Sequence, residues 1–233
     1  MKNVLLALPF LVAATFALAQ SPDPALPKSR SQASEQWSED GLRKVPVKGM
    51  DVVYMRPEVS LAGYRKIWLG PVTVSFRRGW EQSARIGTRS RVRPEDAQRI
   101  RERLTAAVRE ETLAELARGG YTLVESAGED VLQVQAAITD LYINAPDLRT
   151  AANVQVYAVS AGEMTLVAEL RDSSSGEVLV RAYDHARGRE SSRPHRIFRS
   201  ENEQEARAAA RAWAETLRKQ LDAANQAPPA SAE

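Results

Sequence analysis

The feature that most constrains the fold of this chain is a change in the spacing of its apolar residues. Residues 94–118 and 200–224 place apolar side chains three and four residues apart, which predicts two amphipathic helices. Residues 130–143, 153–160 and 163–184, which lie between them, alternate apolar with polar side chains, as half-buried strands do. A chain that changes period in this way is expected to pack helices against a sheet, and the sequence therefore predicts an α+β fold.

The alternating segments are expected to form one mainly antiparallel sheet, with both helices packed on a single face and the other face partly in water. Within residues 163–184, the turn-forming residues Asp172 to Gly176 predict a hairpin. With a further strand at residues 64–76, the predicted order is β-α-β-β-β-α.

That further strand, "YRKIWLGPVTVSF", contains a shift of one residue in its alternation. Apolar side chains stand first on odd and then on even positions: Ile67 and Leu69, then, after Gly70-Pro71, Val72, Val74 and Phe76. A Gly-Pro inside a strand indicates a bulge or a bend at a sheet edge. We expect the bend to let the two halves of the strand pack on different layers.

Residues 1–19 are predicted to be a signal peptide. Lys2 precedes an apolar run, and Ala17 to Ala19 form a small-x-small site that predicts cleavage near Ala19-Gln20. The run is short for a membrane span, which leaves an uncleaved anchor as the alternative. The expected location is therefore periplasmic or secreted. Because the chain has no cysteine, its stability there must come from the core alone.

The remaining boundaries follow from composition. Residues 20–40 and 225–233 are rich in Ser, Pro, Ala and polar residues, so we expect a disordered leader and a disordered tail around a single α+β domain at 41–224. The formal net charge of +2 is near balance, which argues against a nucleic-acid partner.

Chemistry-bearing motifs are scarce. The absence of cysteine excludes thiol nucleophiles, and neither of the two histidines, His185 and His195, has the spacing of a metal ligand. His185 follows Asp184, but adjacent residues on a strand point to opposite faces. Glu111 and Glu115 are expected to face solvent on a helix. No catalytic residue, metal site or cofactor is predicted, and the chain is not expected to be an enzyme.

One segment, residues 77–93, is locally basic, with Glu81 as its single acid. The candidate binding residues are Arg77, Arg78, Trp80, Arg85, Arg89, Arg91 and Arg93. A basic segment with an aromatic side chain suits an anionic glycan, a lipid headgroup at a membrane surface or an acidic protein. The alternative is a connection whose arginines only keep it solvated.

Several segments in order resemble the uncharacterised bacterial envelope protein family known as domain of unknown function 3313. They are "DVVYMRPEVSLAGYRKIWLGPVTVSF", "DVLQVQAAITDLYINAP", "LVAELRDSSSGEVLVRAYDHARG" and "ARAWAETLRKQLD". The resemblance covers residues 40–222 and implies a cell-envelope protein without assigned catalytic residues. Members are typically lipoproteins with a cysteine after the signal peptide, whereas this chain has Gln20 there. The element order is also similar to that of ring-forming polysaccharide-export lipoproteins.

Three hypotheses follow. The first is a non-catalytic envelope protein that binds a protein partner or assembles with itself through the exposed sheet face, a sheet edge or the basic segment. The second is a binder of anionic cell-wall glycan or lipid headgroups through residues 77–93. The third is an enzyme of an unrecognised class, for which the sequence offers no residues.

Overall fold

The structure is a computed structural model that describes residues 40–83, 85–86, 90–144, 156–158, 162–188, 192–193, 195–197 and 199–226. The predicted signal peptide, the leader up to residue 39 and the tail from residue 227 lie outside the described residues.

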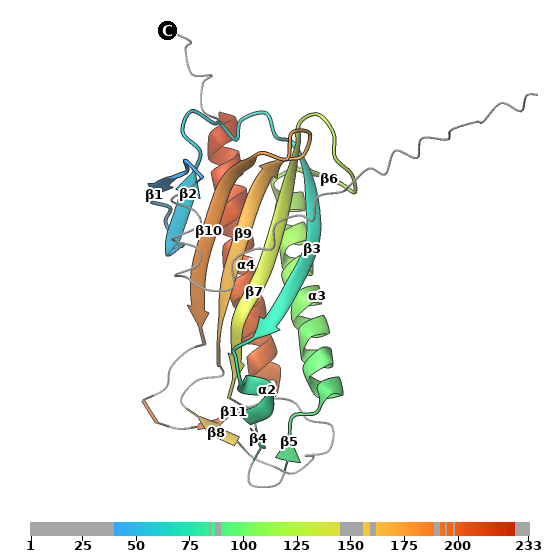
Figure 1. Ribbon diagram of the computed structural model, residues 1–233, viewed down its shortest axis with the longest axis vertical. Coiled ribbons are helices and arrows are strands. Elements are labelled where there is room, and N and C mark those ends of the chain that lie inside the picture. The colour runs from blue at the N-terminus through green and yellow to red at the C-terminus, as the bar shows by residue number, and fades with distance from the viewer. Residues whose placement is uncertain are drawn as a thin grey trace, which may run out of the picture.

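A seven-stranded sheet forms the centre of the molecule, in the order β1-β2-β10-β9-β7-β3-β6 (Figure 1). Its strands are β1 (Arg43–Val45), β2 (Val52–Met55), β3 (Lys66–Phe76), β6 (Thr122–Val124), β7 (Val131–Ile143), β9 (Gly162–Asp172) and β10 (Val178–Arg187). The strand predictions at 64–76 and 130–143 and the hairpin at 163–184 are confirmed. The first two strands were not predicted.

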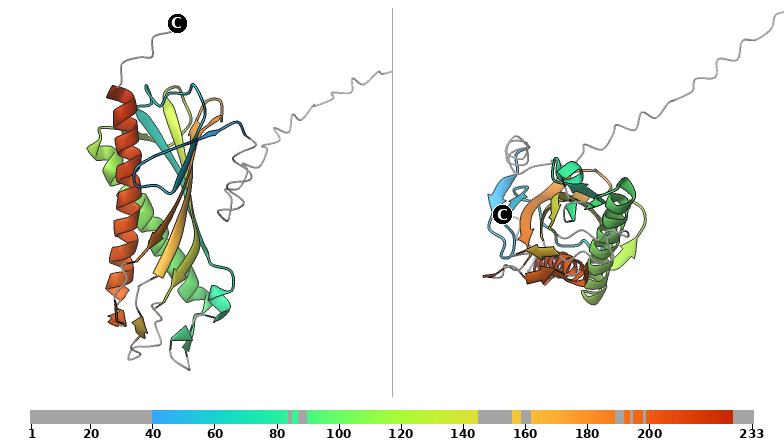
Figure 2. Two further views of the ribbon diagram at one scale, coloured as in Figure 1. Left: turned by 90° about the vertical axis from the view of Figure 1, so that its left-hand side faces the viewer. Right: turned by 90° about the horizontal axis from the view of Figure 1, so that it is seen from below.

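Two long helices, α3 (Pro94–Arg118) and α4 (Arg199–Gln226), lie side by side on one face of this sheet (Figure 2). The core that joins the layers includes Leu116 of α3, Leu221 of α4 and Leu132 of β7, all of them fully buried. The α+β class and both long helices are confirmed. A short third helix, α2 (Trp80–Ser83), was not predicted.

The sheet is mixed rather than uniformly antiparallel. Strand β3 runs parallel to β7 on one side and to β6 on the other, whereas the remaining pairs of the main sheet are antiparallel. The parallel pairs arise because α3 carries the chain back across the sheet after β3, as in a β-α-β unit. The prediction of a mainly antiparallel sheet therefore holds only in this coarser form.

The predicted strand at 153–160 does not belong to the main sheet. Its described part, β8 (Val156–Ala158), pairs with β11 (His195–Ile197) in a separate two-stranded ribbon. A second ribbon joins β4 (Arg85–Ile86) to β5 (Ser90–Arg91). The prediction of one sheet is wrong here, because alternation predicts a strand but not its pairing partner.

The Gly-Pro step in β3 is a bulge, but it does not divide the strand between two layers. The register of β3 against β7 shifts between Leu69 and Val72. Both side chains are buried toward the helices, Leu69 beside Leu116 and Val72 beside Leu104. Between Leu69 and Val72, β3 has one residue more than β7. This extra residue compensates for the change from odd to even apolar positions, so the apolar side chains before and after it stay on one face. The expectation of two layers is wrong.

The short strand β6 covers the outer edge of β3 only from Lys66 to Trp68. Other features cover the edge after Trp68. Arg109 of α3 directs its Nη1 to the carbonyl oxygens of Leu69 and Gly70, at 3.3 and 3.5 Å. Pro71 has no N–H to offer. These features protect the edge against pairing with another strand.

The sheet face opposite the helices is only partly in water, because the central strands carry buried side chains there. Glu169 is only 2% exposed and accepts hydrogen bonds from Arg171 Nη2 and Arg181 Nε, both at 2.6 Å. Val167 and Tyr183 are buried beside this group. The charges tolerate burial because each is paired.

Candidate functional site

The predicted basic segment begins at the end of β3, where two of its residues are built into the fold. Trp80 is 3% exposed, stacks on Phe76 with ring centroids 4.2 Å apart and donates its indole N–H to the carbonyl oxygen of Ile143 at 3.1 Å. Arg77 forms an ion pair with Glu163 and lies 4.9 Å from the ring centre of Tyr142. The indole therefore anchors α2 and is not presented at the surface.

The other candidate arginines are not gathered around Trp80 by any described contact. Arg78 and Arg93 are exposed, and the Arg93 backbone N–H donates to Asp96 at the start of α3. Arg85 and Arg91 lie in the β4–β5 ribbon, where only the backbone is described, and Arg89 lies outside the described residues. Binding through these residues remains a prediction.

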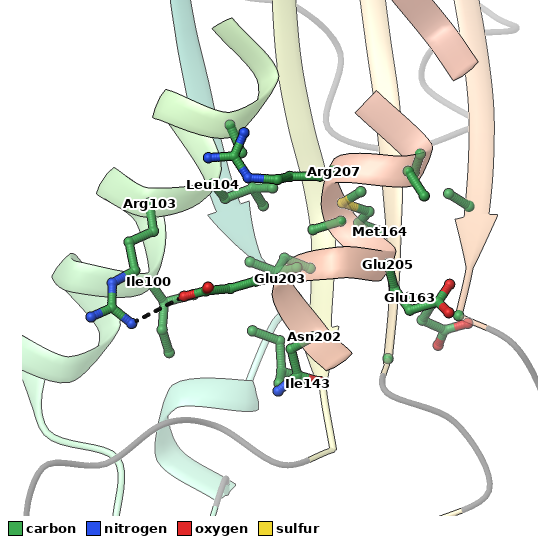
Figure 3. Close-up of a pocket in the computed structure, with 18 of the residues that line it drawn as sticks. Ile100, Arg103, Leu104, Ile143, Glu163, Met164, Asn202, Glu203, Glu205 and Arg207 are labelled. Carbon is green, nitrogen blue, oxygen red and sulfur yellow. Dashed lines mark hydrogen bonds and ion pairs between the residues drawn. The ribbon is translucent and has the colours of Figure 1, made fainter. Parts of the chain in front are cut away.

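A cavity of about 540 Å³ lies between the first halves of α3 and α4, the end of β7, the start of β9 and the end of β10 (Figure 3). Cavities of this size are typical of small-molecule sites. Its apolar lining comes from all five elements and includes Ile100, Leu104, Ala107, Leu141, Ile143, Met164, Ala186, Ala206 and Ala209. We call it the first cavity.

Several charged side chains of the lining are exposed and mark the opening of the first cavity. Arg103 of α3 and Glu203 of α4 are 41% and 48% exposed and join the two helices by an ion pair of 3.4 Å (Figure 3). Arg187, at the end of β10, is 56% exposed and lies 3.4 Å from Glu163. The cavity is therefore apolar inside and charged at its mouth.

Glu163 is the most connected residue of this mouth. Its carboxylate accepts from Arg77 and lies 3.2 Å from His185 Nε2, in addition to its ion pair with Arg187. Burial would raise the pKa of Glu163, but the hydrogen bond and charge of Arg77, together with His185 and Arg187, hold that pKa below its ordinary value. Arg77 thus brings the start of the basic segment to the rim of the cavity.

A hydrogen-bonded chain runs from Glu163 through His185 to Thr165, whose Oγ1 lies 3.1 Å from His185 Nδ1. The arrangement has the order of an acid, a base and a hydroxyl nucleophile. However, Thr165 is 1% exposed, so a substrate cannot reach its hydroxyl. Asp184 points to the opposite face of the sheet from His185, as the sequence predicts, and accepts from Trp213 Nε1 at 2.6 Å.

A second cavity of about 300 Å³ lies farther along the same layer, between α4 and the middle of the sheet. Its lining is almost entirely aliphatic and includes Val53, Met55, Leu69, Val72, Val108, Val134, Leu166, Leu170, Val180, Ala210, Trp213 and Leu217. Neither cavity was predicted from the sequence. The only local signal was the run of small residues on α4, where alanine leaves room between helix and sheet.

Glu111 and Glu115 do not face solvent, as the sequence suggested; they lie buried between α3 and α4. Glu111 is 8% exposed and accepts from Arg211 Nε at 2.9 Å and Arg207 Nη1 at 3.2 Å, and Glu115 accepts from Arg218. The hydrogen bond from Arg211 is the main reason that the pKa of Glu111 lies below its ordinary value, with Arg207 adding to it.

The signal for this burial was present in the helical spacing. Glu111 and Glu115 continue the stripe of Leu104 and Val108 along α3, so they point toward α4 like the apolar residues before them. The sequence prediction that they face solvent relied on their charge and not on this spacing.

The described residues offer no group of three or more His, Asp or Glu side chains that could hold a metal ion. In the same part of the chain, every helix is too short or too polar to cross a membrane.

No curated protein matches the chain. Among solved structures, the PelC dodecamer from Paraburkholderia phytofirmans is similar with a TM-score of 0.38 and 10% identity, over 75% of this chain and 96% of that chain. A minor lipoprotein from Acinetobacter baumannii has a TM-score of 0.36 and 13% identity, over 69% of this chain and 94% of that chain. The model of the family described as protein of unknown function DUF3313 matches residues 32–217, and the chain therefore belongs to this family.

Proposed function

We propose that this chain is a non-catalytic protein of the bacterial cell envelope that binds an apolar ligand in the first cavity. The observation that carries the proposal is the contrast between the apolar interior of that cavity and its charged mouth. Pockets that bind small molecules have this composition, a mostly apolar lining with a few polar groups that orient the ligand.

The state of the charged groups supports binding rather than catalysis. The cavity's Glu163 is held ionised by Arg77 and Arg187, and Glu203 is paired with Arg103. A general acid or base needs a pKa near the working pH, and a carboxyl group whose pKa is lowered is poorly suited to accept or deliver a proton.

The location is part of the proposal. Residues 1–19 have the pattern of a signal peptide, and cleavage near Ala19-Gln20 would release a periplasmic or secreted protein. Fractionation of cells that express the full sequence tests this, with mass spectrometry of the released chain. A first residue of Gln20 is expected, and a chain that retains Met1 in the cytoplasm would contradict it.

A substitution that fills the first cavity tests the binding function. Ala206→Phe places a ring among the cavity's lining residues, whereas Ala212→Phe places the same ring on the exposed side of α4. The uncharged fluorophore N-phenyl-1-naphthylamine is the probe. We expect it to bind wild type and Ala212→Phe alike and to lose at least tenfold in affinity for Ala206→Phe. Equal binding to all three proteins would place the ligand elsewhere.

A second candidate function is the binding of anionic glycan or lipid headgroups by the basic segment, 77–93. The supporting observation is that Arg77 is paired with Glu163 at the rim of the first cavity, while Arg78 and Arg93 are exposed nearby in the sequence. Binding to vesicles that contain phosphatidylglycerol should weaken steeply from roughly 0.1 to 1 M salt, where the Debye length falls from about 10 to 3 Å. Affinity that is independent of salt would exclude this mode.

A third candidate is a protein partner or self-assembly. Leu123 is 40% exposed on β6, the short strand at the outer edge of the sheet. If copies associate there, Leu123→Glu should convert an oligomer to a monomer, as measured by light scattering on a sizing column. A monomeric wild-type protein would exclude self-assembly and leave a different partner.

A further inference from the structure

The first and second cavities lie in sequence along the same three elements. Leu104, Met164 and Ala206 line the first cavity, and one helical turn or one strand repeat farther on, Val108, Leu166 and Ala210 line the second. All six belong to, or pack against, one apolar cluster.

The second cavity favours hydrocarbon, because its described lining has no charged side chain and, besides Trp213, only Thr112, Thr216 and the exposed Gln220 carry polar groups. Its two threonine hydroxyls are already used within their own helices, since Thr112 donates to the carbonyl oxygen of Val108 at 2.7 Å and Thr216 to that of Ala212 at 2.9 Å. A polar ligand there would lose its hydrogen bonds to water without replacing them, which costs free energy. A hydrocarbon chain gains by the same transfer.

The two linings, placed end to end, follow a long path rather than a round one. The lining follows α4 from Ala206 in the first cavity to Leu217 in the second. At 1.5 Å per residue, this part of the helix is about 17 Å long. All charged residues of the described lining belong to the first cavity, where Arg103 and Arg187 are exposed and pair with Glu203 and Glu163 at 3.4 Å each.

We propose that the ligand is a single-chain anionic lipid, such as a fatty acid, whose chain passes through the first cavity into the second while its head group remains at the mouth beside Arg103 and Arg187. This inference rests on the proposed function, because it requires that the first cavity bind a ligand. It adds the chemical class, the depth and the direction of that ligand.

A chain-length series tests the depth of binding. Octanoate, dodecanoate and hexadecanoate displace the naphthyl probe from wild type, and the affinity should rise by roughly fourfold for each methylene group that enters the protein. We expect dodecanoate to bind at least tenfold more tightly than octanoate. Dodecylamine, which has the same chain length, should bind at least tenfold more weakly than dodecanoate.

A variant that fills only the second cavity supplies the control. Ala168 lines that cavity from β9, and Ala168→Leu should leave the affinity for octanoate unchanged while abolishing the gain for dodecanoate. Retained octanoate binding shows that the variant is folded. Should the variant not fold, Ala182→Leu fills the same cavity from β10.

The outcomes separate this inference from the proposed function. If the probe binds in the first cavity but dodecanoate binds no better than octanoate, or as well to Ala168→Leu as to wild type, the chain does not enter the second cavity and the inference is wrong. If dodecylamine binds as tightly as dodecanoate, the anionic head group is wrong. If neither the probe nor any fatty acid binds, the proposed function fails as well.

Discussion

At the scale of single residues, Gly162 shows how closely the strands approach beside the first cavity. It opens β9 opposite Ile143, and a Cβ atom at this position would lie 2.2 Å from the carbonyl oxygen of Tyr142. Because that neighbour is backbone, it cannot move aside without distorting β7. We expect Gly162→Ala to lower the free energy of unfolding by about 1–3 kcal/mol, measured by urea denaturation.

Gly128→Ala is the matched control for this prediction. Its added methyl group would meet only a Val131 side-chain carbon at 3.6 Å, an ordinary contact. The unfolding free energy should therefore change by about 0.5 kcal/mol or less. Equal effects of the two substitutions would show that the approach of β9 to Tyr142 is not tight.

Elements are held together by charge as well as by apolar packing, and the α3–α4 interface gives a test. Glu111→Gln keeps the shape of the side chain but removes the charge that faces Arg207 and Arg211. Both arginines are about half exposed, so solvent screens their attraction to Glu111. We therefore expect Glu111→Gln to lower the free energy of unfolding by only about 1 kcal/mol at neutral pH. Glu110→Gln, which loses only an exposed pair with Arg207, should cost less than half as much.

The same interface has a pH dependence of known sign. Because the pKa of Glu111 in the folded protein lies below its ordinary value of 4.5, the native state favours the carboxylate. Its stabilising effect is complete above that value and is lost as the pH falls through the lower, native pKa. The difference in stability between wild type and Glu111→Gln should therefore shrink as the pH falls from about 4.5. A difference that is constant over this range would contradict the ion pairs.

Sequence patterns predicted elements better than they predicted the relations between elements. The two long helices and the hairpin of β9 and β10 follow from local period and turn residues, and these were correct. The parallel pairing of β3, the separate ribbon of β8 and the burial of Glu111 depend on partners far away in the chain, which period and charge do not specify. The bulge at Gly70-Pro71 was predicted, but its effect on the side-chain direction was not.

The candidate site was the least predictable part. A basic segment is visible in sequence, yet its Trp80 proved to be a buried anchor and its Arg77 a partner of Glu163. The cavities are formed by small and aliphatic residues from both helices and several strands. Such residues read as ordinary core in a sequence, because empty space arises only from how the layers fit together.

At the scale of the whole molecule, the central claim is that the space between the two helices and the sheet is a ligand site. The most direct test is the quenching of tryptophan fluorescence by dodecanoate that carries bromine at its methyl end. Trp213 lines the second cavity, so the bromine should quench its emission in wild type. In Trp213→Phe, the same ligand should still bind, with the quenched component absent. Binding without quenching in wild type, or equal quenching in both proteins, would show that the chain lies elsewhere and would contradict the account.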